Sequence, residues 1–490
     1  MAKIHDLRSA LEHLKTIPGE LIETDVPINA DAEICGVYRR VGAMGTVQRP
    51  TRPGPAMIFN NITGYPGARV AIGLNCSRKR VGHLLDCPPE KLGFLLKDCV
   101  ANRIAPEMAK PDEVLCQEVV HRAEDPDFDI RKIVPAPRNT PEDAGPYITL
   151  GHCYGSDPET GEHDITIHRL CLQDRDTMTF TAAPGRHIEA FRRKWEAQGK
   201  AMPISVNIGI DPAIPIACCF EPPTTPLGFD ELSIAGALRG EPVKLAQCLT
   251  IDQQCVANAE YVLECEILPN VTRRENPDPK SPWSMPEFPG YEGLTYENAA
   301  VLKVKAVTTR LNPIMQTCIG PSDEHVNMAG IPTEASILTL TEKALPGFVT
   351  NVYSTRSGGG KIMVIMAVNK CRSVDQGKER QAALLAFAAY HELKHVVLVD
   401  DDIDIFDTDD VLWALNFRFA ADRDLITIPE TICHPLDPSQ KQLYTGYRRN
   451  GLACKAIFDC TIPYELREEL FHRAQFLDID PKPYAPDLFA

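Results

Sequence analysis

The sequence predicts an α/β fold in which a β-rich middle part lies between two regions of alternating helices and strands. Near the N-terminus, amphipathic helical patterns alternate with short apolar strands over about a hundred residues, a normal domain size. From residue 116, many short β-type runs are separated by Pro, Gly and Asp, which favours a barrel or a sandwich. From Ile331, strands and helices alternate again at the spacing of βαβ units.

The predicted parts are residues 1–115, 116–315 and 316–460, followed by a helix and tail at 461–490. In the first part we expect helices at 4–16, 30–44, 79–86 and 88–101. The middle part contains β-type runs such as YITLGHCYG, DITIHRLCL, TMTFTA, PISVNIGI, PIACCF, EYVLECEIL and LKVKAVTTR. Helices at 185–199 and 229–239 interrupt these strands. In the third part, TEASILTLTEKAL, RQAALLAFAAYHEL and DDVLWALNFRFA are the predicted helices.

The composition narrows the class of protein. An apolar content of 44% and a charged content of 24% over 490 residues are typical of globular domains. The net charge of −16 argues against nucleic acid or an anionic membrane surface as a partner. No apolar run approaches the roughly 20 residues that span a bilayer. The 17 cysteines are scattered and form no CxxC motif, which predicts reduced thiols and a cytoplasmic location.

The stretch from His163 to His187 is the strongest candidate for a functional site. Its first strand places Asp164 on one face, and a second strand from Thr177 follows an Asp-Arg-Asp turn. Such a hairpin brings Asp164 close to His187, and a carboxylate beside an imidazole could hold a divalent cation. A hairpin with polar edges is the alternative. Arg169 lies on the opposite face of a regular strand from Asp164, so a shared site requires a twist or a bulge between them.

Other motifs have a functional and a structural interpretation. HELKH at 391–395 matches the zinc-protease pattern, but it falls at a predicted helix end and runs directly into a strand. SGGGK at 357–361 lacks the Ser or Thr of a phosphate loop, so it is a flexible turn or places Lys361 in a site. The acidic run 400–410 favours a helix N-cap at Asp407 or Thr408 over a calcium loop. Glu287, in the Pro-rich loop 267–295, is either a solvated carboxylate or a general acid with a raised pKa.

Eight segments, in chain order, form a recognisable set: NTPEDAGPYITLG, HDITIHRL, AAPGRHIEAF, PPTTPLGFDELSIAGALRG, MPEFPGYEG, GPSDEHVNMAGIPTEASI, GGGK and LVDDDIDIFDTDDVLWALNFR. Together they resemble the UbiD-type decarboxylases, which use prenylated FMN, and most closely their protocatechuate and gallate (hydroxybenzoate) branch. The resemblance covers essentially the whole chain. It implies a central split β-barrel that binds the flavin and a C-terminal α/β domain that joins a homo-oligomer, either a dimer or a hexamer.

The resemblance also implies a metal site. Asp164, His187 and Glu231 match its ligands, which hold manganese, with potassium as a further candidate, against the cofactor phosphate. Much of the family has Asn at the first position, so Asp164 adds a negative charge here. The implied cofactor-binding residues are Asp164, Ile165, Thr166, Ile167, His168, Arg169, Arg186, His187, Glu231 and Lys394.

For catalysis, the resemblance assigns Arg169 to the substrate carboxylate and Glu287 to proton donation. Pro282 stands where the first of two acids is expected, so the third catalytic member is not placed from the sequence. The substrate pocket is implied to contain His325, Lys361 and His434.

The implied reaction is the reversible decarboxylation of gallate or protocatechuate to pyrogallol or catechol and CO2. The alternatives are another acid, such as vanillate, 4-hydroxybenzoate or a heteroaromatic acid, and a cofactor-binding member of the family without catalysis. A flavin prenyltransferase is the implied cofactor supplier. Small companion subunits are further candidate partners.

Overall fold

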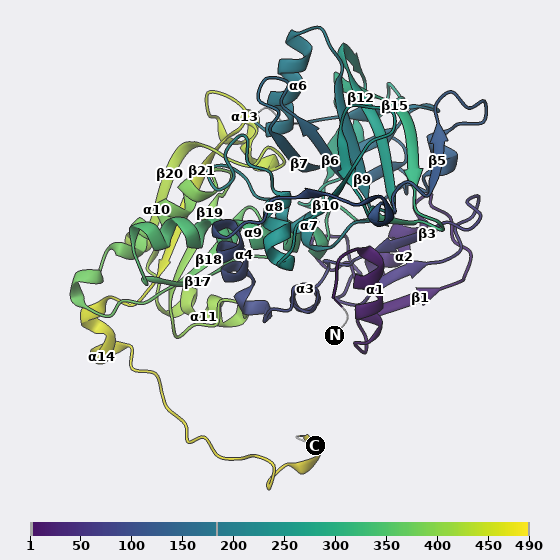
Figure 1. Cartoon of the computed structure of the whole chain (residues 1–490). Helices are drawn as coiled ribbons and strands as arrows, with labels where there is room; N and C mark the ends of the chain where they lie inside the picture. The colour runs from purple at the N-terminus through teal and green to yellow at the C-terminus, as the bar shows by residue number, and fades with distance from the viewer. Residues whose placement is uncertain (1–2, 183–184, 489–490) are drawn as a thin grey trace.

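The computed structural model describes residues 3–182 and 185–488, and it contains the three predicted parts (Figure 1). Ala183 and Pro184, which belong to the segment AAPGRHIEAF, lie outside the described residues. The N-terminal part forms a four-stranded sheet in the order β1-β2-β3-β16, so a strand from residue 314 onward completes it. Its strands are β1 (Leu21–Thr24), β2 (Ala56–Phe59), β3 (Arg69–Ile72) and β16 (Ile314–Thr317). Its helices are α1 (Leu7–Lys15), α2 (Glu33–Val41), α3 (Arg78–Leu85) and α4 (Leu92–Ala101).

The first helix shows how local sequence sets an element boundary. The Asp6 side chain accepts a hydrogen bond from the Ser9 amide, and the Ser9 hydroxyl oxygen accepts one from the Asp6 amide, which forms a capping box. Leu7, Leu11 and Leu14 recur at helical spacing and are buried, so the helix packs one apolar face onto the protein.

The central part is a closed antiparallel barrel of six strands, which confirms the predicted barrel (Figure 1). The strand order is β12-β9-β6-β7-β8-β15, and pairing of β12 with β15 closes the ring. The barrel strands are β6 (Tyr147–Ser156), β7 (His163–Leu172), β8 (Thr177–Phe180), β9 (Met202–Ile208), β12 (Tyr261–Arg273) and β15 (Ala299–Thr309). Buried side chains including those of Ile148, Cys153, Leu170, Ile204, Leu263 and Val304 form the core.

Further elements surround the barrel. Strand β5 pairs with β15, and β4, β10 and β11 form a separate three-stranded sheet. The Pro-rich segment that was predicted as a long loop contains a short hairpin of β13 and β14. The bounds are β4 (Glu107–Met108), β5 (Val119–Arg122), α5 (Ile130–Ile133), α6 (His187–Ala197), α7 (Ala213–Ala217), α8 (Leu232–Arg239), β10 (Lys244–Gln247), β11 (Gln254–Val256), β13 (Trp283–Pro286) and β14 (Glu292–Leu294).

The C-terminal part contains a five-stranded sheet in the order β17-β18-β19-β21-β20 with helices packed against it (Figure 1). Its strands are β17 (Val349–Ser354), β18 (Met363–Val368), β19 (His395–Asp400), β20 (Leu425–Ile432) and β21 (Leu452–Cys460). Its helices are α9 (Asp323–Ala344), α10 (Lys378–Ala389), α11 (Thr408–Phe417), α12 (Ala421–Asp424), α13 (Gln442–Thr445) and α14 (Arg467–Leu470). After α14 the chain runs away from the body of the protein as an extended arm (Figure 1).

Two predicted elements were wrong. PIACCF was expected as a strand, but Ala213–Ala217 form helix α7, which begins where the Asp211 side chain accepts a hydrogen bond from the Ala213 amide. A short apolar run that is buried on all sides has no periodicity that separates a strand from a helix. Helix α9 begins at Asp323, ten residues before its predicted start, and it includes Pro332.

Two motif interpretations were correct. Helix α10 ends at Ala389, before HELKH, so the two histidines of that motif do not share a helix. Asp407 caps α11 by accepting a hydrogen bond from the Asp409 amide. Across the described ranges 3–182 and 185–488, no helix combines the length and the apolar character that a membrane span requires.

Candidate functional site

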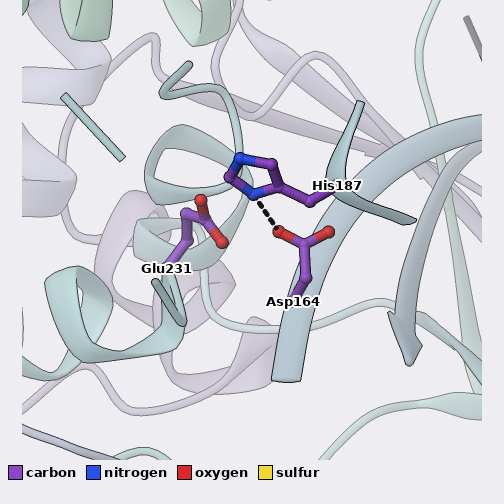
Figure 2. Close-up of side chains that lie close together, drawn as sticks. All are labelled: Asp164, His187 and Glu231. Atoms are coloured by element: carbon purple, nitrogen blue, oxygen red, sulfur yellow. Dashed lines mark hydrogen bonds and ion pairs between the residues drawn. The ribbon is translucent and has the colours of Figure 1, made fainter. Parts of the chain in front are cut away.

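Asp164, His187 and Glu231 converge from three different elements, as Figure 2 shows. Asp164 lies on β7, His187 is the first residue of α6, and Glu231 is the residue before α8. One potential ligand atom from each residue lies within 4.8 Å of the others. The His187 Nδ1 and Asp164 Oδ1 atoms are 3.1 Å apart, a hydrogen bond that orients the imidazole.

The polar atoms of this triad are not fully paired. Asp164 Oδ2, His187 Nε2 and Glu231 Oε2 are buried and lack a hydrogen-bond partner within residues 3–182 and 185–488. Burial and the neighbouring Asp164 carboxylate raise the pKa of Glu231 well above its ordinary value. Two carboxylates and one imidazole with orphaned atoms suit a hard divalent cation, so the residues present fit the metal implied by the resemblance.

Arg169 lies five residues after Asp164 on β7 and belongs to a second charged cluster. Its Nε and Nη2 atoms donate to the two carboxylate oxygens of Glu275 at 3.1 and 3.0 Å, a bidentate ion pair. Its Nη1 atom donates to Glu287. Tyr147 donates a further hydrogen bond of 3.1 Å to Glu275. The acid that could not be placed from the sequence therefore has a structural candidate, Glu275, which is only 2% exposed.

Strand β7 pairs with β6 in regular register from His163 to His168. The register shifts beyond that stretch, where Ile148 and Gly151 of β6 face Leu170 and His168. Strand β6 therefore has one extra residue opposite Arg169, and such a bulge increases the local twist at the Arg169 end of β7.

Glu287 is joined at this site by a second carboxyl that the sequence analysis missed. Burial raises the pKa of Glu287, while Arg169 opposes that rise. Burial, with Asp143, Glu142 and Glu287 nearby, raises the pKa of Glu292 to about 7. The Glu292 Oε2 atom is buried and unpaired within the described part of the chain. Glu292 can therefore hold or release a proton near neutral pH.

Two of the predicted substrate residues, His325 and His434, contact the Phe288 ring, and the charge of Lys361 lies near both imidazoles. The Phe288 ring stacks on His325 with centroids 4.9 Å apart and meets the edge of His434 at 4.8 Å. Lys361 lowers the pKa of His325 and of His434, in addition to the effect of burial, so both imidazoles are neutral near pH 7. Phe288 follows Glu287 directly, and this short segment links the Arg169 cluster to the histidine pocket.

The other predicted cofactor residues have mixed environments. Ile165 is fully buried, and the Thr166 hydroxyl lies 2.7 Å from His168 Nε2. Arg186 pairs with Glu221 at 2.5 Å. Lys394, by contrast, binds Asp437 at 2.7 Å and Ser439 at 2.6 Å within the C-terminal part. Its role toward a cofactor stays a prediction.

Comparison with known families covers nearly the whole chain. Residues 108–322 match the 3-octaprenyl-4-hydroxybenzoate carboxy-lyase Rift-related domain of the UbiD family. Residues 13–99 and 326–460 match the N-terminal and C-terminal domains of the same carboxy-lyase. The gallate decarboxylase of Lactiplantibacillus plantarum is 50% identical over 477 residues, which is 97% of each chain.

Solved structures agree with this comparison. The apo 3,4-dihydroxybenzoic acid decarboxylases of Enterobacter cloacae and Klebsiella pneumoniae each superpose with a TM-score of 0.94 at 50% identity. Both alignments cover 99% of this chain and 100% of the other. The UbiD-class enzyme HmfF of Pelotomaculum thermopropionicum, solved in complex with FMN, matches with a TM-score of 0.85 at 31% identity, over 98% of each chain.

Proposed function

Because the chain belongs to the UbiD family of carboxy-lyases, we propose that it decarboxylates a hydroxylated benzoic acid, reversibly and without net oxidation. The proposed substrates are gallate and protocatechuate, with pyrogallol or catechol and CO2 as products. The observation that carries the proposal is the continuity of two clusters. Arg169 bonds Glu287, and the next residue, Phe288, contacts His325 and His434. The segment Glu287–Phe288 therefore contacts Arg169, the proposed anchor for the substrate carboxylate, on one side. On the other side it contacts the histidines proposed to bind the ring hydroxyls.

Loss of CO2 from an aromatic ring leaves a carbanion that side chains stabilise poorly, so an electron-sink cofactor is required. A flavin, which we propose to be prenylated FMN made by a flavin prenyltransferase, supplies that sink when bound. Asp164, His187 and Glu231 would hold Mn²⁺, with K⁺ as an additional cation, against its phosphate. The other predicted cofactor residues extend from this triad along β7 and to Arg186.

The chain's own residues position the substrate and move a proton. Arg169, held by Glu275, presents a fixed guanidinium to the substrate carboxylate. Glu287 is the proposed proton donor to the ring carbon that loses CO2. Its bond to Arg169 favours the ionised form, whereas Glu292 is unpaired and has a pKa of about 7. Glu292 is therefore a second candidate for the proton source, either directly or by supplying Glu287.

The wider predictions also stay proposals. We expect a homo-oligomer, a dimer or a hexamer, and allow small companion subunits. The vanillic acid decarboxylase of Sedimentibacter hydroxybenzoicus shares the fold at 24% identity and a TM-score of 0.79. The alternative substrates to be tested alongside gallate and protocatechuate are vanillate, 4-hydroxybenzoate and heteroaromatic acids. The same assay tests whether the protein is a cofactor-binding family member without catalysis.

The test is CO2 release by protein co-expressed with a flavin prenyltransferase, measured against this panel of acids. Release from gallate or protocatechuate supports the proposal, and turnover of only another acid changes the substrate assignment. Bound flavin without turnover of any acid would identify a non-catalytic family member. Glu287→Gln and Glu292→Gln, compared at equal flavin content, separate the two proton-donor candidates. A wild-type rate in Glu287→Gln would remove Glu287 from that role.

A further inference from the structure

Glu392 is the glutamate of the HELKH segment that is not a zinc-protease helix, and the proposed reaction gives it no role. It lies in the connection between α10 and β19 and is 7% exposed. Its Oε2 atom lies 3.3 Å from His434 Nε2 and accepts a hydrogen bond of 2.9 Å from the Tyr390 hydroxyl. Glu392 of the HELKH segment, and Tyr390 two residues before it, therefore lie beside His434 of the predicted substrate pocket.

Tyr390 connects Glu392 to the other polar residue of the pocket. Lys361 Nζ lies 2.8 Å from the Tyr390 hydroxyl and 3.0 Å from Glu221 Oε1. The Tyr390 side chain is almost completely buried, at 3% exposure. Two hydrogen bonds therefore run from Lys361 through Tyr390 to Glu392, and the Glu392 carboxylate lies 3.3 Å from His434 Nε2.

The chemistry of each group fixes the direction of these bonds. A carboxylate only accepts, so Tyr390 donates its single proton to Glu392 and its oxygen accepts from the Lys361 ammonium. Burial beside two carboxylates raises the pKa of Tyr390 well above its ordinary value, so that proton stays in place. His434 Nδ1 accepts from the Leu436 amide at 3.2 Å, which leaves the proton of the neutral ring on Nε2, facing Glu392.

This arrangement decides which groups remain for a ligand. Both ring nitrogens of His434 have partners, and two of the three N–H donors of Lys361 are used. The third Lys361 donor is available. The Nδ1 atom of His325 is buried and has no hydrogen-bond partner among the described residues, so it can accept. One cationic donor and one neutral acceptor therefore remain for a ligand, and His325 is stacked on Phe288.

We infer that Tyr390 and Glu392 are positioning residues which orient Lys361 and fix the His434 tautomer, so that the pocket selects rings with adjacent hydroxyl groups. One hydroxyl oxygen accepts from Lys361, and the neighbouring hydroxyl donates to His325 Nδ1. This inference rests on the proposed function, because it deepens the substrate assignment of the same pocket. It predicts that ring hydroxyls contribute to affinity through groups that Tyr390 holds in place.

The test measures binding rather than turnover alone. Purified full-length protein is titrated with protocatechuate and with benzoate, which lacks the hydroxyls, by isothermal titration calorimetry. The dissociation constant of benzoate divided by that of protocatechuate isolates the contribution of the hydroxyl groups. In Tyr390→Phe we expect this ratio to fall about tenfold while benzoate affinity is unchanged, because one hydrogen bond to a charged group is lost. Tyr353→Phe, a half-buried tyrosine on β17 outside the network, is the matched control.

A merely structural role for Tyr390 would weaken both ligands equally and leave the ratio at its wild-type value, which would overturn the inference. If Tyr390→Phe does not fold, Glu392→Gln and Glu392→Ala answer the same question. Gln keeps an acceptor for Tyr390 and should keep most of the ratio, whereas Ala should lower it. An Ala variant with the wild-type ratio contradicts the inference.

The experiments distinguish failure of the proposed decarboxylase function from failure of the inferred positioning role of Tyr390. CO2 release with an unchanged binding ratio leaves the proposed function standing and removes the role of Tyr390. A lowered ratio without CO2 release from any acid supports the binding role and removes the decarboxylase activity.

Discussion

Two charged clusters on the same strand, β7, differ in how well their polar atoms are satisfied. Around Arg169, the guanidinium nitrogens bind Glu275 and Glu287, and Glu275 also accepts a hydrogen bond from Tyr147. Around Asp164, each member of the triad keeps a buried atom that lacks a partner within the described ranges. The charged groups of the first cluster are paired with one another, whereas the second cluster has unpaired atoms that suit a cation. The difference teaches that orphaned buried atoms favour a missing ligand, whereas paired charges favour preorganisation.

Arg169→Ala should give the largest effect. Removing the guanidinium leaves Glu275 and Glu287 buried without a counter-ion, which we expect to cost about 3 kcal/mol of unfolding free energy. CO2 release should fall about a thousandfold, because the carboxylate anchor is lost. Urea unfolding and turnover measure the two effects. Arg131→Ala removes an exposed ion pair with Asp129 and should change stability by less than about 1 kcal/mol. Undiminished turnover in Arg169→Ala would contradict the anchor role.

Glu231→Gln should act in opposite directions on the metal-free and metal-bound protein. Loss of one ligand should weaken Mn²⁺ binding about a hundredfold. Without metal, the variant should unfold at the same or a higher temperature, because the buried repulsion between two carboxylates is relieved. Calorimetric Mn²⁺ titration and thermal melts with and without Mn²⁺ test both. Glu189→Gln, on helix α6 in an ion pair with Arg192, is the control. Unchanged Mn²⁺ affinity in Glu231→Gln would show that the triad is not the metal site.

Glu292 gives a prediction for pH. Its pKa of about 7 lies above the ordinary 4.5, so ionisation disfavours the fold. The wild type should lose stability from this group as the pH rises from 4.5 through 7, and Glu292→Gln should not. If Glu292 supplies the proton, turnover should fall above pH 7 in the wild type, and Glu292→Gln should lack that limb. Unfolding and rate profiles from pH 5 to 8 measure this, with the exposed Glu297→Gln as control. Identical profiles in Glu292→Gln and wild type would exclude the assignment.

Asp164→Asn should have the smallest effect. The amide keeps an oxygen ligand and removes one negative charge, so Mn²⁺ should bind about tenfold more weakly while the fold is retained. The same change should reduce the electrostatic repulsion on the Glu231 carboxylate. The triad would then resemble the Arg169 cluster more closely, because it would hold less uncompensated negative charge. Calorimetry measures the affinity. An Asn variant that binds Mn²⁺ more tightly than the wild type would show that the extra charge of Asp164 does not strengthen the site.

Candidate site residues could be identified from the sequence where they lie in one short segment or in a long motif that matches a known family. Asp164 and His187 were placed together because a hairpin predicts their approach, and Glu231 and Arg169 were identified through resemblance. The structure brings the three triad residues together, while their role as metal ligands stays a prediction. The β-rich middle part and the flanking α/β regions were also predicted correctly, because period-2 and period-3.6 patterns are local signals. The patterns left a barrel or a sandwich open, and the resemblance selected the barrel.

Other residues carried no local signal. Glu275 lies 106 positions from Arg169, two residues past the end of barrel strand β12, and only the folded barrel brings it to the guanidinium on β7. Glu392 belongs to the HELKH motif, whose sequence suggested different chemistry, and Tyr390 lies just before it. Glu292 was not identified from the sequence, and the hairpin of β13 and β14 places it near Glu287.

The sequence by itself determined the fold class and the strand that carries Asp164 and Arg169, because strand alternation and helix capping depend on neighbours in the chain. The resemblance to a known family was needed to choose the barrel over a sandwich. Only the tertiary structure decided which side chains meet and which atoms remain unpaired. Ion pairs and hydrogen bonds across a hundred residues depend on barrel closure and register, and a one-residue shift such as that opposite Arg169 redirects a side chain. The difference between a cluster of paired charges and one with unpaired atoms is therefore a property of the folded chain.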